Sequence, residues 1–319
     1  MTAGFRSRLA ADLEHFLEFK RAMGRSYVGA EITLRSFDRF VHAHASPKGP
    51  LALADLVRRW LAQAEGRKPA SIKHDLSRVR QFLLFRRRTD AGGFVPGRAF
   101  APRSTSSVFV PHVFSLEEVR TLLAAAARLP GPPFYGRTIR LLLLVLYCTG
   151  LRFGEALRLR FRDVDLRRRL FVVHESKGKT RLVPFREDLA RQLRMYRRER
   201  DRVAAPPVET FFIQLSGRPF TIGVASYIVR RLLRRTGLKP EHGRVGPRPY
   251  DFRATFAVHR LTRWHHRRVD LAARLPWLSA YMGHVDLLGT EVYLTATPEL
   301  LALAGRRLRA RLHTSRTSP

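Results

Sequence analysis

The sequence predicts a mainly α-helical protein of two domains that also carries a small β-hairpin or sheet. Three observations support this fold class. Apolar residues recur at helical spacing through residues 1–90 and again through much of the chain after residue 114. Between these stretches, residues 91–113 contain clusters of glycine, proline and serine. Short β-rich runs flank Lys177-Gly178-Lys179, which is typical of a hairpin with a basic tip.

We predict that residues 1–90 form a small helical domain. Its apolar stripes are Leu13, Phe16, Leu17 and Met23, then Ile32, Phe37, Phe40 and Val41, then residues 51–64, and finally Ile72, Leu76, Val79, Phe82, Leu83 and Phe85. The other face of the fourth predicted helix is basic and carries Lys73, Arg78, Arg80, Arg87 and Arg88. A linker is expected at residues 91–113.

The second predicted domain covers residues 114–319. Ser115 followed by Glu118 is a capping-box pattern, which predicts a helix from Leu116 to Arg128. The segment from Arg137 to Cys148 is apolar nearly all round, so we expect a buried helix that ends at the glycine that follows Thr149. Further helical patterns begin at Asp188, Thr221, Asp251, Leu271 and Pro298.

The chain is strongly basic. It holds 60 lysine and arginine residues against 26 acidic residues, a net charge of +34, and the excess lies in both domains. Nearly all of these cations are arginine, whose planar fork binds phosphate through two hydrogen bonds. We therefore expect a polyanionic partner held by both domains, and double-stranded DNA fits best, with an anionic membrane surface as the alternative.

Other classes are excluded or disfavoured. No apolar run reaches the roughly 18 residues that a membrane-spanning helix needs. The single cysteine, Cys148, excludes an internal disulfide framework and a multi-cysteine zinc site. His265 and His266 are adjacent and would face different sides of a helix, so we expect a solvated basic face there. The expected compartment is the cytoplasm, and we expect no metal ion, cofactor or membrane partner.

Two of the four motifs that could carry chemistry are basic. A glycine turn precedes Arg152 and would present it at the start of a helix, a position suited to phosphate, with Glu155 one turn further on to hold it. Lys177 and Lys179 lie within three residues in a chain that has seven lysines. An ammonium group can donate its proton as a general acid, whereas a guanidinium group stays protonated.

The other two motifs carry tyrosine, arginine and histidine. Tyr250 and Arg253 are three residues apart and would share one helix face, with Phe252, Phe256 and Leu261 on the buried face. His284 follows a glycine, and Tyr293 comes nine residues later. Taken singly, each of these residues also fits a solvated or packed position. Their functional interpretation depends on all of them occurring together.

Together and in this order, the motifs resemble those of the tyrosine recombinases, or phage integrases, whose pattern is Arg, Lys, His-x-x-Arg, His and Tyr. The most specific matches are Thr149-Gly150-Leu151-Arg152-x-x-Glu155, Lys177-Gly178-Lys179-x-Arg181-x-x-Pro184, and Gly283-His284 followed by Tyr293. The resemblance extends over essentially the whole chain and implies a helical, SAM-like core-binding domain ahead of a catalytic domain. The segment after Tyr293 resembles that of transposon-borne bacterial members.

The resemblance implies a site-specific recombinase that cuts and rejoins DNA through a 3′-phosphotyrosine intermediate without metal or ATP. Arg152 and Arg253 would bind the scissile phosphate, Lys177 would be the general acid, His284 would support the transition state, and Tyr293 would be the nucleophile. Tyr250 stands where the family usually has histidine. A phenol can donate one hydrogen bond but cannot shuttle protons near neutral pH. The expected DNA contacts are Lys73, Arg78, Arg80, Lys179 and Arg181.

The family also implies how the protein assembles. We expect a homotetramer on paired DNA sites in the bacterial cytoplasm, associated with the nucleoid when bound to DNA, with accessory proteins as a further class of partner. The pattern of residues 298–311 predicts an amphipathic helix. In the family such a helix commonly docks onto a neighbouring subunit, and the alternative is that it folds back on its own domain. Two alternatives stay open: a DNA-binding factor of the same fold with impaired catalysis, and a type IB topoisomerase, which would act as a monomer.

Overall fold

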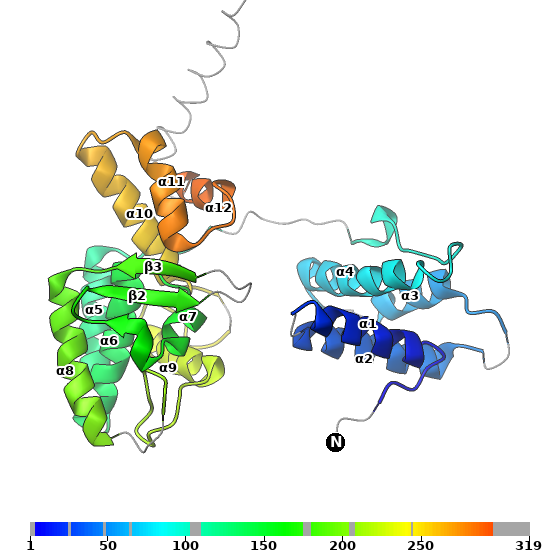
Figure 1. Cartoon of the computed structure of the whole chain (residues 1–319), viewed down its shortest axis with the longest axis horizontal. Helices are drawn as coiled ribbons and strands as arrows, with labels where there is room; N and C mark the ends of the chain where they lie inside the picture. The colour runs from blue at the N-terminus through cyan, green and yellow to red at the C-terminus, as the bar shows by residue number, and fades with distance from the viewer. Residues whose placement is uncertain are drawn as a thin grey trace, which may run out of the picture. The chain divides into compact units, whose positions relative to one another are not determined.

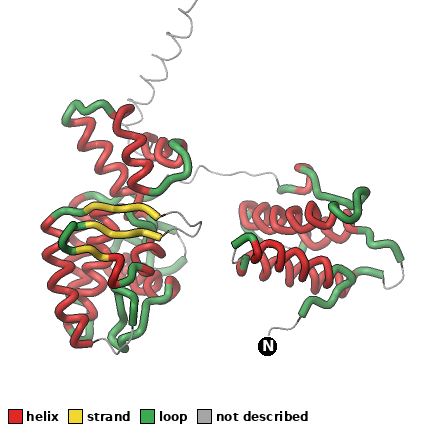
Figure 2. Tube along the Cα trace, viewed as in Figure 1, coloured by secondary structure: helices red, strands yellow, loops and turns green. Residues whose placement is uncertain are grey.

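The computed structural model describes residues 4–24, 27–46, 49–63, 66–102, 110–174, 180–203, 208–243 and 245–295. The chain divides into two compact units, Met1–Phe109 and Val110–Pro319. Lys177, Lys179 and the stretch 298–311 lie outside the described residues. None of the described helices is long and apolar enough to cross a membrane. The mainly helical fold with a small sheet is confirmed (Figure 2).

The first unit is helical, as predicted (Figure 1). Its helices are α1 (Ala10–Ala22), α2 (Val28–His44), α3 (Leu53–Ala62) and α4 (Pro69–Arg86). Pro69 begins α4, where its fixed φ is suitable and its missing N–H has no helical partner to lose. Phe16, Phe37 and Phe82 lie fully buried among the apolar stripes read from the sequence.

The segment that follows α4 contributes to the first unit. It forms a short 3₁₀-helix, η1 (Arg98–Phe100), and four of its apolar side chains pack against the helical core: Phe94, Val95, Phe100 and Ala101. The surrounding glycine and proline residues predict a linker at these positions. Those residues end the helix, but they do not prevent the neighbouring apolar side chains from packing.

The second unit contains the helices that follow η1 along the chain. They are α5 (Leu116–Ala127), α6 (Pro133–Thr149), α7 (Phe153–Arg158), η2 (Phe161–Asp163), α8 (Glu187–Val203), α9 (Ile222–Arg235), α10 (Asp251–His266), α11 (Leu271–Met282), α12 (Leu288–Glu291) and η3 (Val292–Thr295). The predicted capping box is confirmed, because Ser115 Oγ accepts from the Glu118 N–H at 3.0 Å while Glu118 Oε2 accepts from the Ser115 N–H at 2.7 Å. Helix α6 is largely buried, as predicted.

A three-stranded antiparallel sheet lies beside these helices (Figure 2). Its strands are β1 (Val164–Asp165), β2 (Leu170–His174) and β3 (Thr180–Pro184), in that order. The β2–β3 pairing confirms the predicted hairpin, and Phe171 lies opposite Val183 with both side chains buried. Strand β1 was not predicted, because its two residues are too few to show an alternating pattern. Since side chains alternate along a strand, Arg181 shares the inward face of β3 with Val183.

Most of the buried apolar residues that the structure describes in the second unit fall into two clusters. The larger one surrounds α6 and the inner face of the sheet. The smaller one lies between α10, α11 and η3. Figure 1 shows α10, α11 and α12 together at one end of the unit. Tyr281 packs against both clusters. The residues singled out from the sequence meet where these two clusters join.

Candidate active site

Arg152 is presented by the turn that ends α6. Gly150 has φ +61°, and a Cβ there would lie 2.4 Å from the ring of Phe256, so both the backbone conformation and the space require glycine. Arg152 directly precedes α7, and its backbone N–H and its Nη1 each donate to the Glu155 carboxylate at 2.8 Å. Glu155 therefore holds Arg152, as the sequence predicted.

A second arginine binds the same carboxylate. Arg181 donates from Nη2 to Glu155 Oε2 at 2.8 Å and from Nη1 to Oε1 at 3.2 Å. Burial raises the pKa of Glu155, but hydrogen bonds from Arg181 and then Arg152 outweigh this and bring the pKa down to about 2. The carboxylate is thus ionised at neutral pH and ties α7 to strand β3.

Three arginines from different elements bind the C-terminal end of α11. The last carbonyls of a helix lack intrahelical partners and carry the negative end of its dipole. Here three consecutive carbonyls each accept from one guanidinium: Tyr281 from Arg181 at 3.1 Å, Met282 from Arg253 at 2.7 Å, and Gly283 from Arg152 at 2.8 Å. The residue that follows, His284, is therefore placed by the same arginines.

Arg253 lies at the centre of the site and is 1% exposed. Its Nη1 donates to the Gly150 carbonyl at 2.7 Å, so this one side chain joins the end of α6 to the end of α11. Its Nε is buried and has no hydrogen-bond partner among the described residues. Burial and the nearby charge of Arg152 both lower the pKa of Arg253. Arg253 and Arg152 therefore place two positive charges close together in the site.

His284 follows α11 at a glycine in the left-handed conformation, with φ +69° at Gly283. The Nδ1 atom of its ring lies 2.6 Å from the hydroxyl of Thr290. Burial, and then the charges of Arg253, Arg152 and Arg181, lower the pKa of His284 to about 4. The imidazole is therefore neutral at physiological pH.

Tyr293 lies in η3 and is 5% exposed. Its ring is 6.1 Å, centroid to centroid, from that of His284, with 30° between the planes. Burial raises the pKa of Tyr293, and the charge of Arg253 partly offsets this. Tyr250, by contrast, is 47% exposed, yet it is close enough to affect the pKa of both Arg253 and Tyr293. The structure thus brings together four of the six predicted catalytic residues, namely Arg152, Arg253, His284 and Tyr293. Tyr250 lies at the edge of this group.

The expected DNA contacts lie in different surroundings. Lys73 is exposed, and Arg80 is exposed while its Nε donates to the Pro96 carbonyl at 3.1 Å. Arg78 is half-buried and donates to the Thr33 hydroxyl at 2.7 Å. The side chain of Arg181 is only 11% exposed. We expected Arg181 at the surface as a DNA contact, but its side chain lies inside the protein. The reason is that Arg181 is on the inward face of β3, which directs it to Glu155.

Sequence reasoning missed Thr290 and assigned Arg181 to DNA. For Arg181 the signal was available, since its two-residue offset from apolar Val183 places both on one face of a strand.

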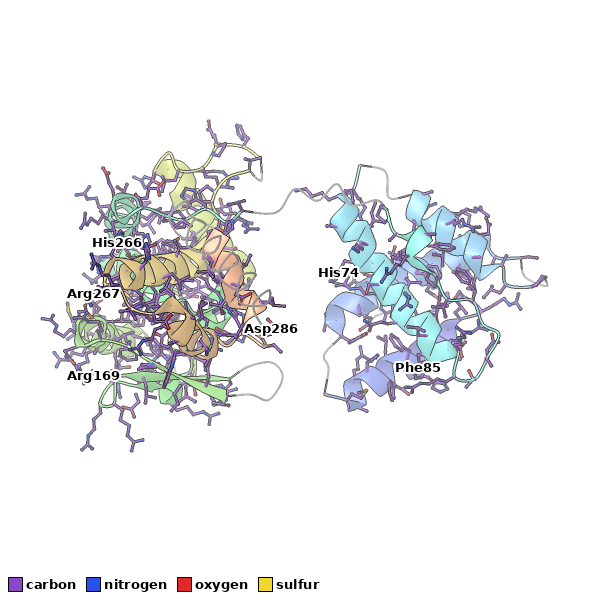
Figure 3. All side chains as sticks on the ribbon, turned by 90° about the horizontal axis from the view of Figure 1, so that it is seen from above. His74, Phe85, Arg169, His266, Arg267 and Asp286 are labelled. Atoms are coloured by element: carbon purple, nitrogen blue, oxygen red, sulfur yellow. The ribbon has the colours of Figure 1, made fainter. Side chains whose placement is uncertain are left out.

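His266 and Arg267, at the far end of α10, lie on the opposite side of the second unit from Asp286 in the turn after His284 (Figure 3). Within the described ranges, no three His, Cys, Asp or Glu side chains are grouped to hold a metal ion.

Two arginines, a histidine and a buried tyrosine come together on a helical unit with a small sheet, as expected for a tyrosine recombinase. The phage integrase family model matches residues 112–299. The putative integrase/recombinase y4rE of Sinorhizobium fredii is 32% identical over 96% of this chain and 97% of its own. The tyrosine recombinase XerC of Lacticaseibacillus casei is 26% identical over 90% and 93%. The chain belongs to the phage integrase family.

Solved structures share the fold. The Tn1549 transposon integrase in complex with a circular intermediate DNA superposes with a TM-score of 0.66 at 16% identity, over 93% of this chain and 99% of that one. The XerH site-specific recombinase bound to palindromic difH substrate gives a TM-score of 0.63 at 18% identity, over 86% and 77%.

The Glu155 carboxylate is expected to make stability depend on acid pH. Its folded pKa of about 2 lies below the ordinary value of 4.5, so its stabilisation is present above pH 4.5 and is lost as the pH falls toward 2. The shift corresponds to roughly 3 kcal/mol. We expect Glu155→Gln to lower the free energy of unfolding at neutral pH and to flatten its pH dependence in this window, as measured by urea unfolding.

Glu187→Gln is the matched control. Glu187 also pairs with an arginine, Arg194, but its side chain is 48% exposed. Its replacement should leave the acid pH dependence nearly as in the wild type. An unchanged pH dependence in Glu155→Gln would show that the buried carboxylate does not hold the site together.

Proposed function

We propose that the protein is a site-specific DNA recombinase that cuts and rejoins DNA through a 3′-phosphotyrosine intermediate, without a metal ion or ATP. The observation that carries the proposal is the position of Tyr293, buried beside His284 and Arg253 in the same chain. Membership of the phage integrase family supports it. Structures of the similar XerH and Tn1549 proteins are described as DNA complexes.

The reaction would proceed by in-line displacement at phosphorus. The Tyr293 hydroxyl gives up its proton to water as its oxygen attacks the phosphodiester, a phosphorus–oxygen bond to tyrosine forms, and the bond to the 5′ oxygen breaks. The 5′ oxygen leaves with a proton supplied by Lys177. Because the phosphotyrosine conserves the energy of the phosphodiester, a 5′-hydroxyl from a second strand can reverse the attack without a nucleotide cofactor.

The two active-site arginines and His284 would meet the charge that develops on the phosphoryl oxygens. Arg152 and Arg253 are already fixed by carbonyl and carboxylate partners, so little reorganisation is needed when the phosphate arrives. Neutral His284 can donate one hydrogen bond. The exposed phenol of Tyr250 can supply one more donor where the family usually has histidine.

DNA would be held by both units, with Lys73, Arg78, Arg80 and Lys179 contacting it. For Arg181 the geometry favours a positioning role instead, since its guanidinium binds Glu155 and the Tyr281 carbonyl. We further propose assembly as a homotetramer on paired sites, with accessory proteins as additional partners, in the bacterial cytoplasm and on the nucleoid.

Lys177, rather than Lys179, is expected to be the general acid. Lys177→Ala should slow cleavage of ordinary DNA by about 10²–10⁴-fold, the usual contribution of a positioned acid. A substrate with sulfur at the 5′-bridging position leaves without a proton and should restore the rate. Single-turnover cleavage of both substrates by Lys177→Ala and Lys179→Ala tests this. Rescue of Lys179→Ala but not Lys177→Ala would reverse the assignment.

The proposed function is tested with DNA that the protein itself selects. Fragments bound from a random pool define the site, and nicked suicide substrates made from it are incubated with protein in excess chelator. We expect a covalent adduct on a denaturing gel, attached to the 3′ phosphate of the cut strand. Specific binding with no adduct on any selected site would favour the catalytically impaired DNA-binding factor. An adduct that forms only when magnesium is added would contradict the metal-free reaction.

A further inference from the structure

We propose that Thr290 is a positioning residue that sets the orientation and the tautomer of His284. Thr290 lies on α12, is 0% exposed, and has its hydroxyl 2.6 Å from His284 Nδ1. The inference rests on the proposed function, because it assigns His284 the task of donating a hydrogen bond to the phosphate. It extends that function to a residue outside the motifs that identified the site.

The tautomer follows from the hydrogen-bonding needs of the two groups. A neutral imidazole carries one N–H, on either Nδ1 or Nε2, and a hydroxyl has one proton to donate. Among the described residues, His284 Nδ1 is the hydrogen-bond partner that the Thr290 hydroxyl contacts. If Nδ1 carried the proton and donated it, the buried hydroxyl proton would be left without an acceptor, which is unfavourable. If the hydroxyl donates to Nδ1, both groups are satisfied and the ring proton stays on Nε2.

The Nε2–H tautomer is the one that suits the reaction. Burial and the surrounding arginines keep His284 neutral, so it can donate to a phosphoryl oxygen only through its single N–H. Because Nδ1 accepts a hydrogen bond from Thr290, the single N–H is on Nε2. Nε2 is the ring nitrogen that is left to donate to a ligand. The opposite tautomer would direct a lone pair at the negatively charged phosphate.

The neighbouring glycine fixes the ring from another side. A Cβ at Gly289 would lie 3.2 Å from His284 Cγ and 3.4 Å from its Cβ, so the backbone of α12 packs directly against the imidazole. The Gly289 N–H donates to Asp286 Oδ1 at 3.0 Å, and the Asp286 carbonyl accepts from the Ser279 hydroxyl at 3.1 Å. The turn between α11 and α12 is thereby tied at both ends.

The same short segment carries the proposed nucleophile. Tyr293 follows Thr290 by three residues, and η3 continues directly from α12. The Thr290–His284 hydrogen bond therefore joins the turn that presents the histidine to the segment that presents the tyrosine. Its loss should affect both the proton position on His284 and the rate of attack by Tyr293.

Thr290→Val removes the hydroxyl at nearly constant volume, and Thr290→Ser keeps it. In full-length protein labelled with ¹⁵N-histidine, two-bond nitrogen–proton correlations report the tautomer, and His284→Gln identifies the signal. We expect Nε2–H in the wild type and in Thr290→Ser, and a mixture of tautomers in Thr290→Val. Adduct formation should fall about 10- to 100-fold in Thr290→Val, by analogy with the loss of partners that orient metal-binding histidines. It should recover in Thr290→Ser with DNA affinity unchanged.

The spectroscopic result does not depend on activity, so it separates failure of this inference from failure of the proposed function. A Thr290→Val protein that keeps the Nε2–H tautomer would overturn the inference, as would equal rates in the wild type and Thr290→Val. If thermal melting shows that Thr290→Val does not fold, Thr290→Ala provides the second variant with the same expected tautomer change. An unchanged tautomer in that variant would likewise overturn the inference.

Discussion

Tyr293→Phe should abolish the covalent protein–DNA adduct and leave DNA affinity unchanged. The phenyl ring can fill the same buried place beside His284, so the packing of η3 is retained. The substitution removes only the hydroxyl oxygen that we propose attacks phosphorus. The measurement is a denaturing gel of the nicked suicide substrate, together with a binding titration on the intact site.

Tyr250→Phe is the matched control, because Tyr250 is the second tyrosine close to Arg253. It is 47% exposed and should tolerate the change in structure. We expect its adduct to form more slowly, through the loss of one hydrogen-bond donor, but to form. An adduct that persists in Tyr293→Phe and disappears in Tyr250→Phe would move the nucleophile to Tyr250.

Arg253→Ala should produce two large losses at once. Its guanidinium is buried and binds the carbonyls of Gly150 and Met282, so its removal leaves buried acceptors unpaired at about 1–3 kcal/mol each. Removing a donor that stabilises the transition-state charge typically costs about 10²–10³ in rate. We therefore expect a lower free energy of unfolding and a strongly reduced rate of cleavage.

Arg152→Ala separates the two effects. Arg152 is only half-buried, so its replacement should slow cleavage by a similar factor while destabilising the fold less. Urea unfolding and single-turnover cleavage of the suicide substrate measure the two quantities. An Arg253→Ala protein as stable as Arg152→Ala would contradict the structural role given to the buried guanidinium.

Several features were predictable because they are local. The glycine turn before Arg152 and the capping box at Ser115 depend on residues a few positions apart. Tyr250 and Arg253 lie close together, as their spacing indicated, although the burial of Arg253 puts it at the centre of the site and leaves Tyr250 at the edge.

Features that depend on distant contacts were not predictable in the same way. Arg181 reaches Glu155, 26 residues earlier, and the Tyr281 carbonyl, 100 residues later. Its basic side chain suggested DNA, and only the inward face of its strand indicates otherwise. Thr290 gives no chemical signal in the sequence, because its role depends on how tightly the turn after α11 brings it back to His284.

The central claim is that this site exchanges strands between two DNA sites. A plasmid carrying two copies of the selected site, incubated with protein in chelator and without ATP, tests it most directly when the products are sequenced across the junctions. We predict exchanged junctions with no bases gained or lost, formed in complexes of four subunits on two sites. Relaxation of supercoils without exchanged junctions, by a protein that binds as a single subunit, would contradict the claim and identify the activity as that of a type IB topoisomerase.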